Sequence, residues 1–304
     1  MTAAPVVVVA NPAAGRGKAG KLIDRVGARL RALGVEHEFQ VSESAADLEA
    51  KSRAAAERGA RIVAVLGGDG SVHFAANGLL GSDAALAVLP AGTGDDFAKA
   101  IGPRKLADAL TALVAPKIRL IDAVHVATAA GERHYVNIAG AGFDSAVNET
   151  ANGMRVNLGG TLTYIAAVLA TLRRFEPATY RILVDDEPID APAMLAVVGN
   201  GVSYGGGMHI LPGASVTDGL LDVCVVKALS VASFLRAFPR VFRGTHVSHP
   251  KVQILRGSVV KMEADREILV YADGERVGPL PATFQVVPQA LLAVVDPETR
   301  AVRQ

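Results

Sequence analysis

The pattern of apolar residues changes once along this chain. Up to about residue 122, short apolar runs alternate with longer segments of helical periodicity, at 6–10, 18–33, 35–41, 45–58, 61–66, 72–80, 84–89, 95–101 and 106–114. Strands that alternate with helices predict a parallel sheet covered by helices, in a Rossmann-like α/β domain. Beyond that point short β-type runs dominate, at 135–139, 180–184, 194–199, 221–226, 252–255, 259–263, 268–271 and 283–287. They predict a second domain built as a β-sandwich.

These patterns predict the domain boundaries. We expect a nucleotide-binding α/β domain over residues 1–122 and a β-rich, substrate-binding domain over 123–290. A tail of about 291–304 is expected to pack back on the first domain. With 304 residues, half of them hydrophobic, the chain is long enough to bury two cores.

Charge and cysteine content narrow the class of protein. The formal net charge is +1, so no basic field points to nucleic acid as the partner. The only cysteine, Cys224, lies in an apolar run and is expected to be a buried strand residue in a reducing cytoplasm. No apolar run approaches the ~20 residues of a spanning helix. We therefore expect a cytoplasmic protein.

The segment Gly67-Gly68-Asp69-Gly70-Ser71 follows the apolar run 62–66 and leads into a helical pattern. Glycines at the end of a strand leave backbone N–H groups free to face an anion, and the next helix adds the positive end of its dipole. An acid in such a loop fits an anion site only if a cation lies between the carboxylate and the phosphate. Asp69 therefore points to Mg²⁺ and a nucleoside triphosphate.

The first loop is open to three interpretations. Gly15-Arg16-Gly17-Lys18-Ala19-Gly20 satisfies the dinucleotide pattern G-x-G-x-x-G, but residues 11–14 separate it from the preceding strand. The segment 15–22 nearly spells a Walker A loop, except that Leu22 occupies the place of the metal-binding hydroxyl. The third interpretation is a separate phosphate-proximal loop, Asn-Pro-x-x-Gly-x-Gly, at 11–17.

That third loop belongs to a set of four segments. They are Asn11-Pro12-Ala13-Ala14-Gly15-Arg16-Gly17, the segment 67–71, the segment 89–98 with Gly92-Thr93-Gly94, and Ala272-Asp273-Gly274-Glu275. In this order and spacing the chain resembles the diacylglycerol kinase catalytic-domain family, in particular its soluble bacterial lipid kinases. That family is related to sphingosine kinases and, more distantly, to NAD kinases. The resemblance covers nearly the whole chain and implies the NAD kinase and diacylglycerol kinase fold.

The resemblance also implies where each ligand binds. It assigns ATP to a set of small residues: Asn11, Pro12, Ala13, Ala14, Gly15, Ser42, Gly67, Gly68, Asp69, Gly70, Ser71, Gly92 and Thr93. Asp69 is assigned to the Mg²⁺ network, and the proton acceptor to Glu275 or its neighbour Asp273. A structural Mg²⁺ is implied at Ser215, Asp218 and Leu220, where oxygen ligands from a tight turn suit a hard cation.

Two positions depart from the family pattern. Asp95 stands where relatives have asparagine, and an ionised acid cannot donate a hydrogen bond. Phe74 stands where many relatives have glutamate. Both departures leave open a non-catalytic regulator that binds nucleotide or lipid. The 15–20 loop leaves open an NAD(P)-dependent oxidoreductase.

The lipid side rests on two apolar stretches and on the family analogy. Phe234, Phe238, Val241 and Phe242 share a face at helical spacing, with arginines opposite, which fits either a core helix or a helix on an anionic bilayer. The stretch 162–172 has the same two interpretations. Asp144 is a further candidate for a substrate contact. The chain is thus predicted to be an ATP- and Mg²⁺-dependent lipid kinase, cytoplasmic and peripherally attached to a membrane, that acts on diacylglycerol and possesses no nucleic-acid site; a homodimer is left open.

Overall fold

The computed structural model describes residues 5–153, 168, 170–172 and 174–302. The chain folds into two compact units. The first comprises 1–123, 215–219 and 287–304, and the second comprises 124–214 and 220–286. The segment 215–219, which a single boundary near residue 122 would give to the second domain, belongs to the first unit. Two strands, β5 (Ile118–Thr128) and β15 (Ala282–Val294), have residues in both units.

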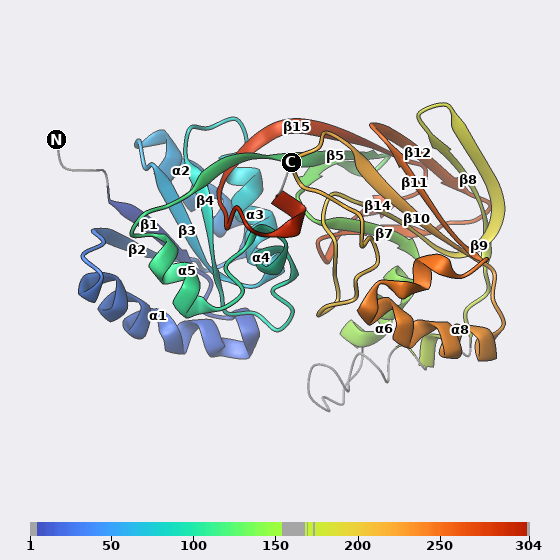
Figure 1. Cartoon of the computed structure of the whole chain (residues 1–304), viewed down its shortest axis with the longest axis horizontal. Coiled ribbons are helices and arrows are strands. Elements are labelled where there is room, and N and C mark those ends of the chain that lie inside the picture. Colours follow the sequence, from blue (N-terminus) through green and yellow to red (C-terminus); the bar gives the residue numbers. More distant parts are fainter. Residues whose placement is uncertain (1–4, 154–167, 169, 173, 303–304) are drawn as a thin grey trace. The chain divides into compact units, whose positions relative to one another are not determined.

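The first unit is a doubly wound α/β structure (Figure 1). Its elements are β1 (Val6–Ala10), α1 (Ala14–Ala32), β2 (His37–Val41), α2 (Ala45–Glu57), β3 (Ile62–Gly67), α3 (Asp69–Leu79), β4 (Ala85–Pro90), α4 (Asp96–Ile101), α5 (Leu106–Ala112) and η3 (Arg300–Val302). The four strands pair in parallel in the order β2-β1-β3-β4, and Ala293 of β15 pairs in parallel with Leu86 of β4.

Burial explains why these segments form central parallel strands. Every residue of β1, β3 and β4 is buried, as expected when helices cover both faces of a parallel sheet. Helices α1 and α5 cover one face, and α2 and α3 cover the other (Figure 1). Helix α2 begins where its sequence predicts, since Ser44 Oγ accepts a 3.1 Å hydrogen bond from the Asp47 amide.

The strand order fixes where a ligand can bind. The chain passes from β1 to β2 on one side and then crosses to β3 on the other, so the order reverses between β1 and β3. In open α/β sheets ligands bind beyond the carboxyl ends of the strands at such a switch point. The loops that follow β1 and β3 are the two that carry Asn11–Gly15 and Gly67–Ser71.

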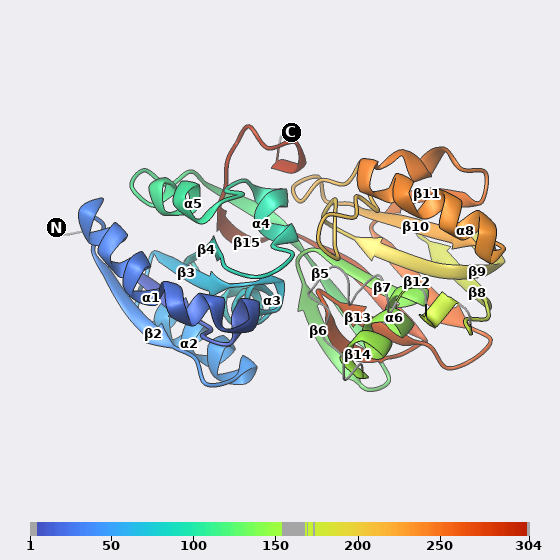
Figure 2. The same cartoon turned by 90° about the horizontal axis from the view of Figure 1, so that it is seen from below.

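The second unit consists of antiparallel strands with helices on one side (Figure 2). Its elements are β6 (Gly131–Tyr135), β7 (Ile138–Gly142), α6 (Phe143–Gly153), β8 (Ala178–Val184), β9 (Glu187–Gly199), β10 (Leu221–Lys227), α8 (Val231–Ala237), η1 (Phe238–Arg243), η2 (Thr245–Ser248), β11 (Val252–Gly257), β12 (Val259–Ala264), β13 (Leu269–Ala272) and β14 (Glu275–Pro279). The prediction of a single strand over 135–139 is wrong, because β6 ends at Tyr135 and β7 begins at Ile138.

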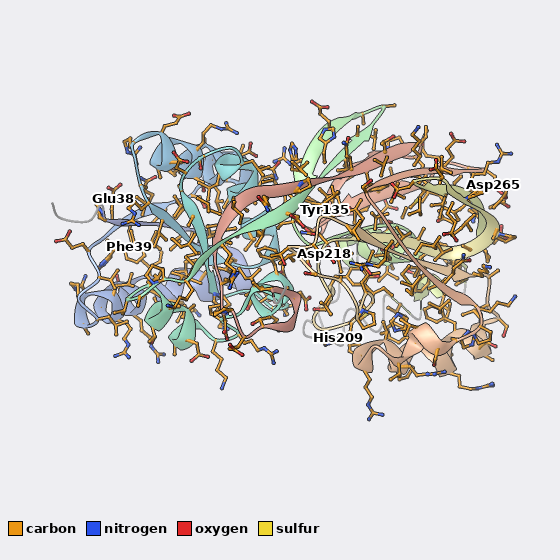
Figure 3. All side chains as sticks on the ribbon, turned by 45° about the horizontal axis from the view of Figure 1, so that its top comes forward. Glu38, Phe39, Tyr135, His209, Asp218 and Asp265 are labelled. Carbon is orange, nitrogen blue, oxygen red and sulfur yellow. The ribbon has the colours of Figure 1, made fainter. Side chains whose placement is uncertain are left out.

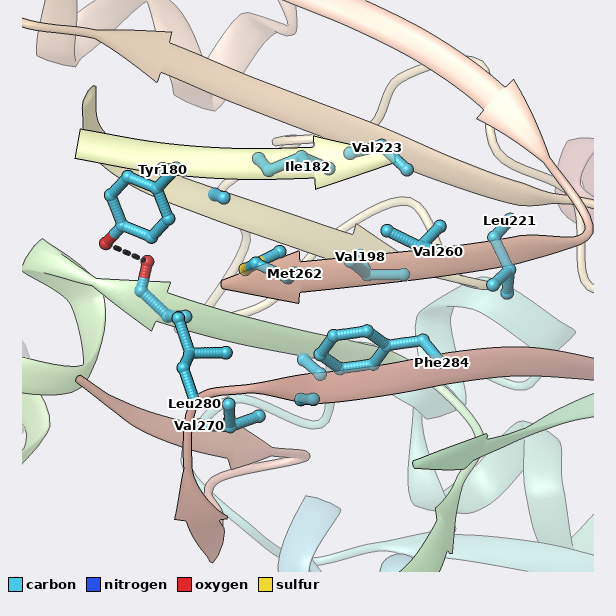
Figure 4. Packing of buried hydrophobic residues seen from close by; sticks show 14 of the residues in the cluster. Tyr180, Ile182, Val198, Leu221, Val223, Val260, Met262, Val270, Leu280 and Phe284 are labelled. Atoms are coloured by element: carbon cyan, nitrogen blue, oxygen red, sulfur yellow. Dashed lines mark hydrogen bonds between the residues drawn. The ribbon is translucent and has the colours of Figure 1, made fainter. Parts of the chain in front are cut away.

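Side chains of alternate residues along the central strands pack into two separate clusters. Val223 and Val225 of β10 join Tyr135, Tyr180 and Phe284 in the interior of the β structure. Figure 4 shows Val223, Tyr180 and Phe284 of this cluster. Cys224 and Val226 face the other way, toward α6 and α8. Cys224 is a fully buried strand residue, as the sequence indicates. Tyr180 satisfies its hydroxyl by donating a 3.1 Å hydrogen bond to the Ala141 carbonyl.

The two stretches considered for lipid contact have different outcomes. Most of 162–172 lies outside the described residues, although Val168 and Leu172 are buried. Within the other stretch, Phe234 and Val241 are buried, whereas Phe242 is 48% exposed. In the described part of the chain, no helix combines the length and apolar character needed to cross a bilayer.

Candidate active site

Asn11 joins the two loops at the switch point of the first unit. Its Nδ2 donates a 3.0 Å hydrogen bond to Ser71 Oγ, and its backbone amide donates to the Leu66 carbonyl at 3.0 Å. Its Oδ1 accepts from the Ala13 amide at 3.1 Å, which forms the turn that leaves β1. One side chain therefore sets the shape of its own loop and its distance from the Gly67–Ser71 loop.

The start of α1 is not helical. Gly15, Arg16 and Gly17 have φ values of 59°, 61° and 81°, all in the left-handed region. A Cβ atom at Gly15 would collide with the Ala91 carbonyl, so only glycine fits this approach to the loop after β4. The Gly17 amide nevertheless donates a 3.1 Å hydrogen bond to the Ala13 carbonyl, which closes this turn.

A second close approach joins the loops after β3 and β4. A Cβ atom on Gly68 would lie 3.0 Å from the Gly92 Cα atom, and one on Gly92 would lie 2.6 Å from the Gly68 Cα atom. The Ala91 amide also donates a 2.9 Å hydrogen bond to the Gly67 carbonyl. The three predicted nucleotide loops of this unit thus form one backbone surface of small residues.

Asp69 lies at the start of α3 and points toward the start of α4. Its Oδ1 accepts a 3.0 Å hydrogen bond from the Phe97 amide. Burial raises the pKa of Asp69 to about 6, and the nearby carboxylates of Asp96 and Asp95 act in the same direction, against the hydrogen bond from Phe97. The carboxylate is therefore both a cap for α4 and an acid that has no ion pair with any residue that the structure describes.

Asp95 accounts for one departure from the family pattern. The residue is left-handed, with φ 50°, and its Oδ1 accepts a 2.9 Å hydrogen bond from the Gly92 amide. Burial raises its pKa, while that hydrogen bond and Lys18 oppose the rise. An asparagine oxygen could accept the same bond, so the exchange preserves the closure of the loop.

Two of the predicted hydroxyl residues, Ser42 and Thr93, differ in their surroundings. Ser42 is buried just after β2, and both its amide and its Oγ donate to the Ala10 carbonyl, at 2.8 and 3.1 Å. Thr93 is exposed in the loop after β4 and makes no hydrogen bond to any described residue. Ser42 therefore holds the edge of the site in place, whereas Thr93 is available to a ligand.

Asp273 of the second unit is fixed by the backbone. Its Oδ1 accepts from the Asn137 and Ile138 amides and its Oδ2 from the Val136 amide, each at 3.1 Å. The residue is left-handed, with φ 52°, in the turn between β13 and β14. These bonds account for the break between β6 and β7. The backbone amides of 136–138 donate to the Asp273 carboxylate and not to a neighbouring strand.

Glu275 begins β14 only two residues later and is half-buried. Among the described residues its carboxylate has neither a hydrogen bond nor an ion pair. The neighbouring acids therefore differ in function: Asp273 shapes the turn, and Glu275 is available for chemistry. Asp69 belongs to the first unit and this pair to the second.

The predicted structural metal site centres on the loop 215–219 of the first unit. Ser215 Oγ donates to the Ala301 carbonyl at 3.1 Å. Asp218, labelled in Figure 3, is exposed. Behind the loop, the buried Asp122 accepts from the Gly219 and Gln289 amides, both at 2.8 Å. Burial raises the pKa of Asp122, and repulsion from Asp218 adds to the rise. A hard cation at Asp218 fits this donor set, since it would relieve that repulsion. Leu220, the next residue along the chain, belongs to the second unit.

Comparison with known proteins identifies the family. Residues 5–126 match the diacylglycerol kinase catalytic domain, and 137–295 match the YegS C-terminal NAD kinase beta sandwich-like domain. A diacylglycerol kinase of Mycobacterium tuberculosis (strain CDC 1551 / Oshkosh) is 39% identical over 290 residues, which are 94% of this chain and 93% of the relative. The chain belongs to the diacylglycerol kinase family.

Two further comparisons agree with this assignment. A diacylglycerol kinase of Bacillus subtilis (strain 168) is 27% identical over 281 residues, 91% of each chain. The crystal structure of a diacylglycerol kinase from Bacillus anthracis str. Sterne shares the fold, with a TM-score of 0.74 at 20% identity, covering 98% of this chain and 99% of that one. The family resemblance and the fold class expected from the sequence are both confirmed.

The second unit of this family member also contains an apolar cavity of about 70 Å³. Phe143, Phe234, Phe238 and Val241 contribute to its lining, together with the buried Asp144. Burial raises the pKa of Asp144 to about 6. The cavity combines apolar walls with one acid that is readily protonated, which suits an amphiphilic ligand.

A basic groove of about 700 Å³ between α1 and α5 escaped the sequence analysis. Its lining includes five cations: Lys18, Arg25, Arg29, Arg104 and Lys105. Within the described part of the chain, no carboxylate lies within ion-pair distance of Arg25, Arg29, Arg104 or Lys105. The spacing of Arg25 and Arg29 on one helix is visible in the sequence, but their approach to Arg104 and Lys105 depends on how α5 packs. Such a groove attracts anions to this unit.

Proposed function

We propose that this chain is a lipid kinase that transfers the γ-phosphoryl group of ATP to the hydroxyl of diacylglycerol, with Mg²⁺ as cofactor. The observation that carries the proposal is the meeting of three glycine loops at the switch point of the first unit, with Asp69 beside them. Relatives named diacylglycerol kinase over nine-tenths of this chain support the same activity and acceptor.

The first unit would bind the triphosphate through its backbone. Glycines 15, 67, 68 and 92 let the three loops approach one another closely, the space beside Gly17 is open, and the exposed Thr93 hydroxyl adds a donor. Helix α3 starts at Asp69, so its free N–H groups and positive dipole end face the same region. The binding of an anion here needs no large movement of side chains.

The acids around these loops fit a divalent cation. Asp69, Asp95 and Asp96 repel one another, and their repulsion helps to raise the pKa of Asp69. Within the described ranges, no three Asp, Glu, His or Cys side chains already form a metal cage. That fits Mg²⁺, which binds through one or two carboxylates and completes its shell with phosphates and water. When bound, Mg²⁺ neutralises charge on the phosphates.

Glu275 would act on the acceptor. The lipid hydroxyl oxygen attacks the γ-phosphorus, the bond from that phosphorus to the β–γ bridging oxygen breaks, and the hydroxyl proton passes to the Glu275 carboxylate. The products are ADP and the phosphorylated lipid. Asp273 acts as a positioning residue, because its three backbone bonds hold the turn that presents Glu275.

The lipid would be drawn from a membrane. The apolar cavity of the second unit suits part of an acyl chain, and Asp144 offers a polar contact there. The protein would therefore work in the cytoplasm and attach peripherally to the bilayer that holds its substrate.

The decisive experiment incubates the protein with γ-labelled ATP and a panel of lipids, with and without Mg²⁺. The proposal expects one labelled product, phosphatidic acid, formed from diacylglycerol only when Mg²⁺ is present. Binding of ATP without any labelled lipid would favour a non-catalytic regulator. Binding of NAD(P)H through the 15–20 loop, with no phosphorylation, would favour an oxidoreductase.

A further inference from the structure

One segment of the second unit has an unbalanced charge. The whole chain contains 31 basic and 30 acidic residues, yet residues 223–262 contain no Asp or Glu. The same segment has seven basic residues: Lys227, Arg236, Arg240, Arg243, Lys251, Arg256 and Lys261. Arg256 pairs with Asp222 just outside the segment, whereas Arg236 and Arg243 have no carboxylate within ion-pair distance among the described residues.

The same segment exposes apolar side chains. Nine large apolar residues are exposed in the described part of the chain, and five of them fall here: Val231, Leu235, Phe242, Val247 and Ile254. Val231 and Leu235 are 48% and 43% exposed and lie one turn apart on α8, so they share a side of that helix. Exposed apolar residues grouped in this way mark a contact surface.

The inner side of α8 and η1 already packs against other aromatic side chains of the second unit. Phe234 packs against Phe143 with ring centroids 4.9 Å apart, and Phe238 stacks on Phe234 at 5.6 Å. Exposed Phe242 continues this row, with its ring 5.9 Å from that of Phe238. The buried side of this segment is therefore complete without Val231, Leu235 and Phe242. The row of aromatic rings leads from exposed Phe242 to the lining of the apolar cavity.

We propose that the outer surface of α8 and η1, formed by Val231, Leu235, Arg236, Phe242 and Arg243, docks on an anionic bilayer. Both views show this segment at the margin of its unit (Figure 1; Figure 2). Apolar side chains beside unpaired arginines match a surface in which acyl chains lie beneath negative headgroups. Each arginine near such a surface contributes roughly fivefold to affinity. The inference rests on the proposed function, since a lipid kinase must reach a membrane.

The test compares two double variants with wild-type protein in co-sedimentation with vesicles. Leu235→Ser with Arg236→Gln removes one leucine and one cation from the docking surface. The matched control is Leu183→Ser with Lys261→Gln, because these exposed residues pair across β8 and β12 of the same unit. The vesicles contain phosphatidylglycerol and phosphatidylcholine, or phosphatidylcholine alone, and no diacylglycerol.

We expect wild-type protein to bind the phosphatidylglycerol vesicles, and we expect this binding to weaken as the salt concentration rises. The docking variant should bind about tenfold more weakly, and the control should stay within twofold of wild type. Equal binding by the docking variant and wild type would overturn the proposal. So would a change of oligomeric state in the docking variant with unchanged vesicle binding, because the surface would then join two copies of the chain.

A kinase assay on short-chain diacylglycerol in detergent separates this inference from the proposed function. There the docking variant should turn over like wild type, which also shows that it is folded. Vesicle binding by wild type without any phosphorylation would reject the kinase and leave the docking surface in place. Full kinase activity with vesicle binding that is unaffected by the docking variant would reject the surface alone.

Discussion

The carboxylate of Asp69 accepts a hydrogen bond from the backbone amide of Phe97 at 3.0 Å, and this bond ties the start of α3 to the start of α4. The same side chain is the proposed magnesium-facing acid. Its structural and chemical functions can be separated, because asparagine retains the accepting oxygen but not the charge.

We expect Asp69→Asn to lose at least ~10²-fold in kcat while its melting temperature stays near that of wild type. Asp69→Ala should lose activity and also stability, by about 1 kcal/mol or more, because the Phe97 amide loses its partner. Steady-state kinetics and urea unfolding measure both effects. Near wild-type activity in Asp69→Asn would remove this residue from the mechanism.

Loss of charge should lower the stability of the protein at Asp273 and its activity at Glu275. Asp273→Asn places an NH₂ group against a backbone amide and should reduce the free energy of unfolding by about 1–3 kcal/mol. Glu275→Gln breaks no hydrogen bond to the described residues, so it should leave stability unchanged and lower kcat by about 10²-fold or more. A stable, inactive Asp273→Asn with an active Glu275→Gln would reverse the two assignments.

Asp144 should make stability depend on pH. Burial raises its pKa to about 6 in the folded protein, so the unfolded chain, with a pKa near 3.8, holds fewer protons between those values. Stability therefore decreases as pH rises from about 4 to 6, and the penalty is complete above that window. Relative to Asp144→Asn, wild-type protein should gain about 1–3 kcal/mol in urea unfolding between pH 7 and pH 4. Parallel pH profiles would contradict this burial.

Two glycines of the first loop offer a matched comparison. Gly15 and Gly17 are both left-handed, but a Cβ atom meets the Ala91 carbonyl only at Gly15, while nothing lies within 4 Å at Gly17. Gly17→Ala should cost about 1–2 kcal/mol from backbone strain. Gly15→Ala should cost at least ~1 kcal/mol more, and it should weaken ATP binding in calorimetry because the loops must separate. Equal costs would mean that the close approach is absent.

The loop at 215–219 should respond to magnesium. We expect Mg²⁺ to raise the melting temperature of wild-type protein by several degrees over that in EDTA. Asp218→Asn should abolish this increase, because the exposed carboxylate would be the charged ligand of the expected site. Asp108→Asn, an exposed acid on α5, serves as the control and should keep the response. An unchanged response in Asp218→Asn would place the ion elsewhere.

The first unit was largely predictable from local patterns. Buried parallel strands such as β1 and β3 leave continuous apolar runs, and the glycines at 67 and 68 mark where β3 must end. The proximity of Gly68 and Gly92 could also be anticipated, since adjacent parallel strands end at the same edge. The left-handed start of α1 could not, because Arg16 has no sequence signal for φ 61°.

The second unit was less predictable because its decisive contacts are distant in sequence. The break between β6 and β7 depends on Asp273, which is more than a hundred residues away. The apolar periodicity at 234–242 fits either a core helix or a helix on a bilayer, and it could not show that Phe234 is buried in α8 whereas Phe242 is exposed in η1. Likewise, the spacing of acids could not show that Asp273 is held by backbone and Glu275 is not.

The path of β15 affects how this protein can fold during synthesis. Ala293 of β15 pairs with Leu86 of β4, and β15 also pairs with β5, although about two hundred residues are translated between Leu86 and Ala293. The glycine loops of the first unit are synthesised early. Their sheet is complete only after nearly the whole chain has emerged from the ribosome. We expect nascent chains arrested before residue 287 to be protease-sensitive in the first unit, and release of the remaining strand to protect it.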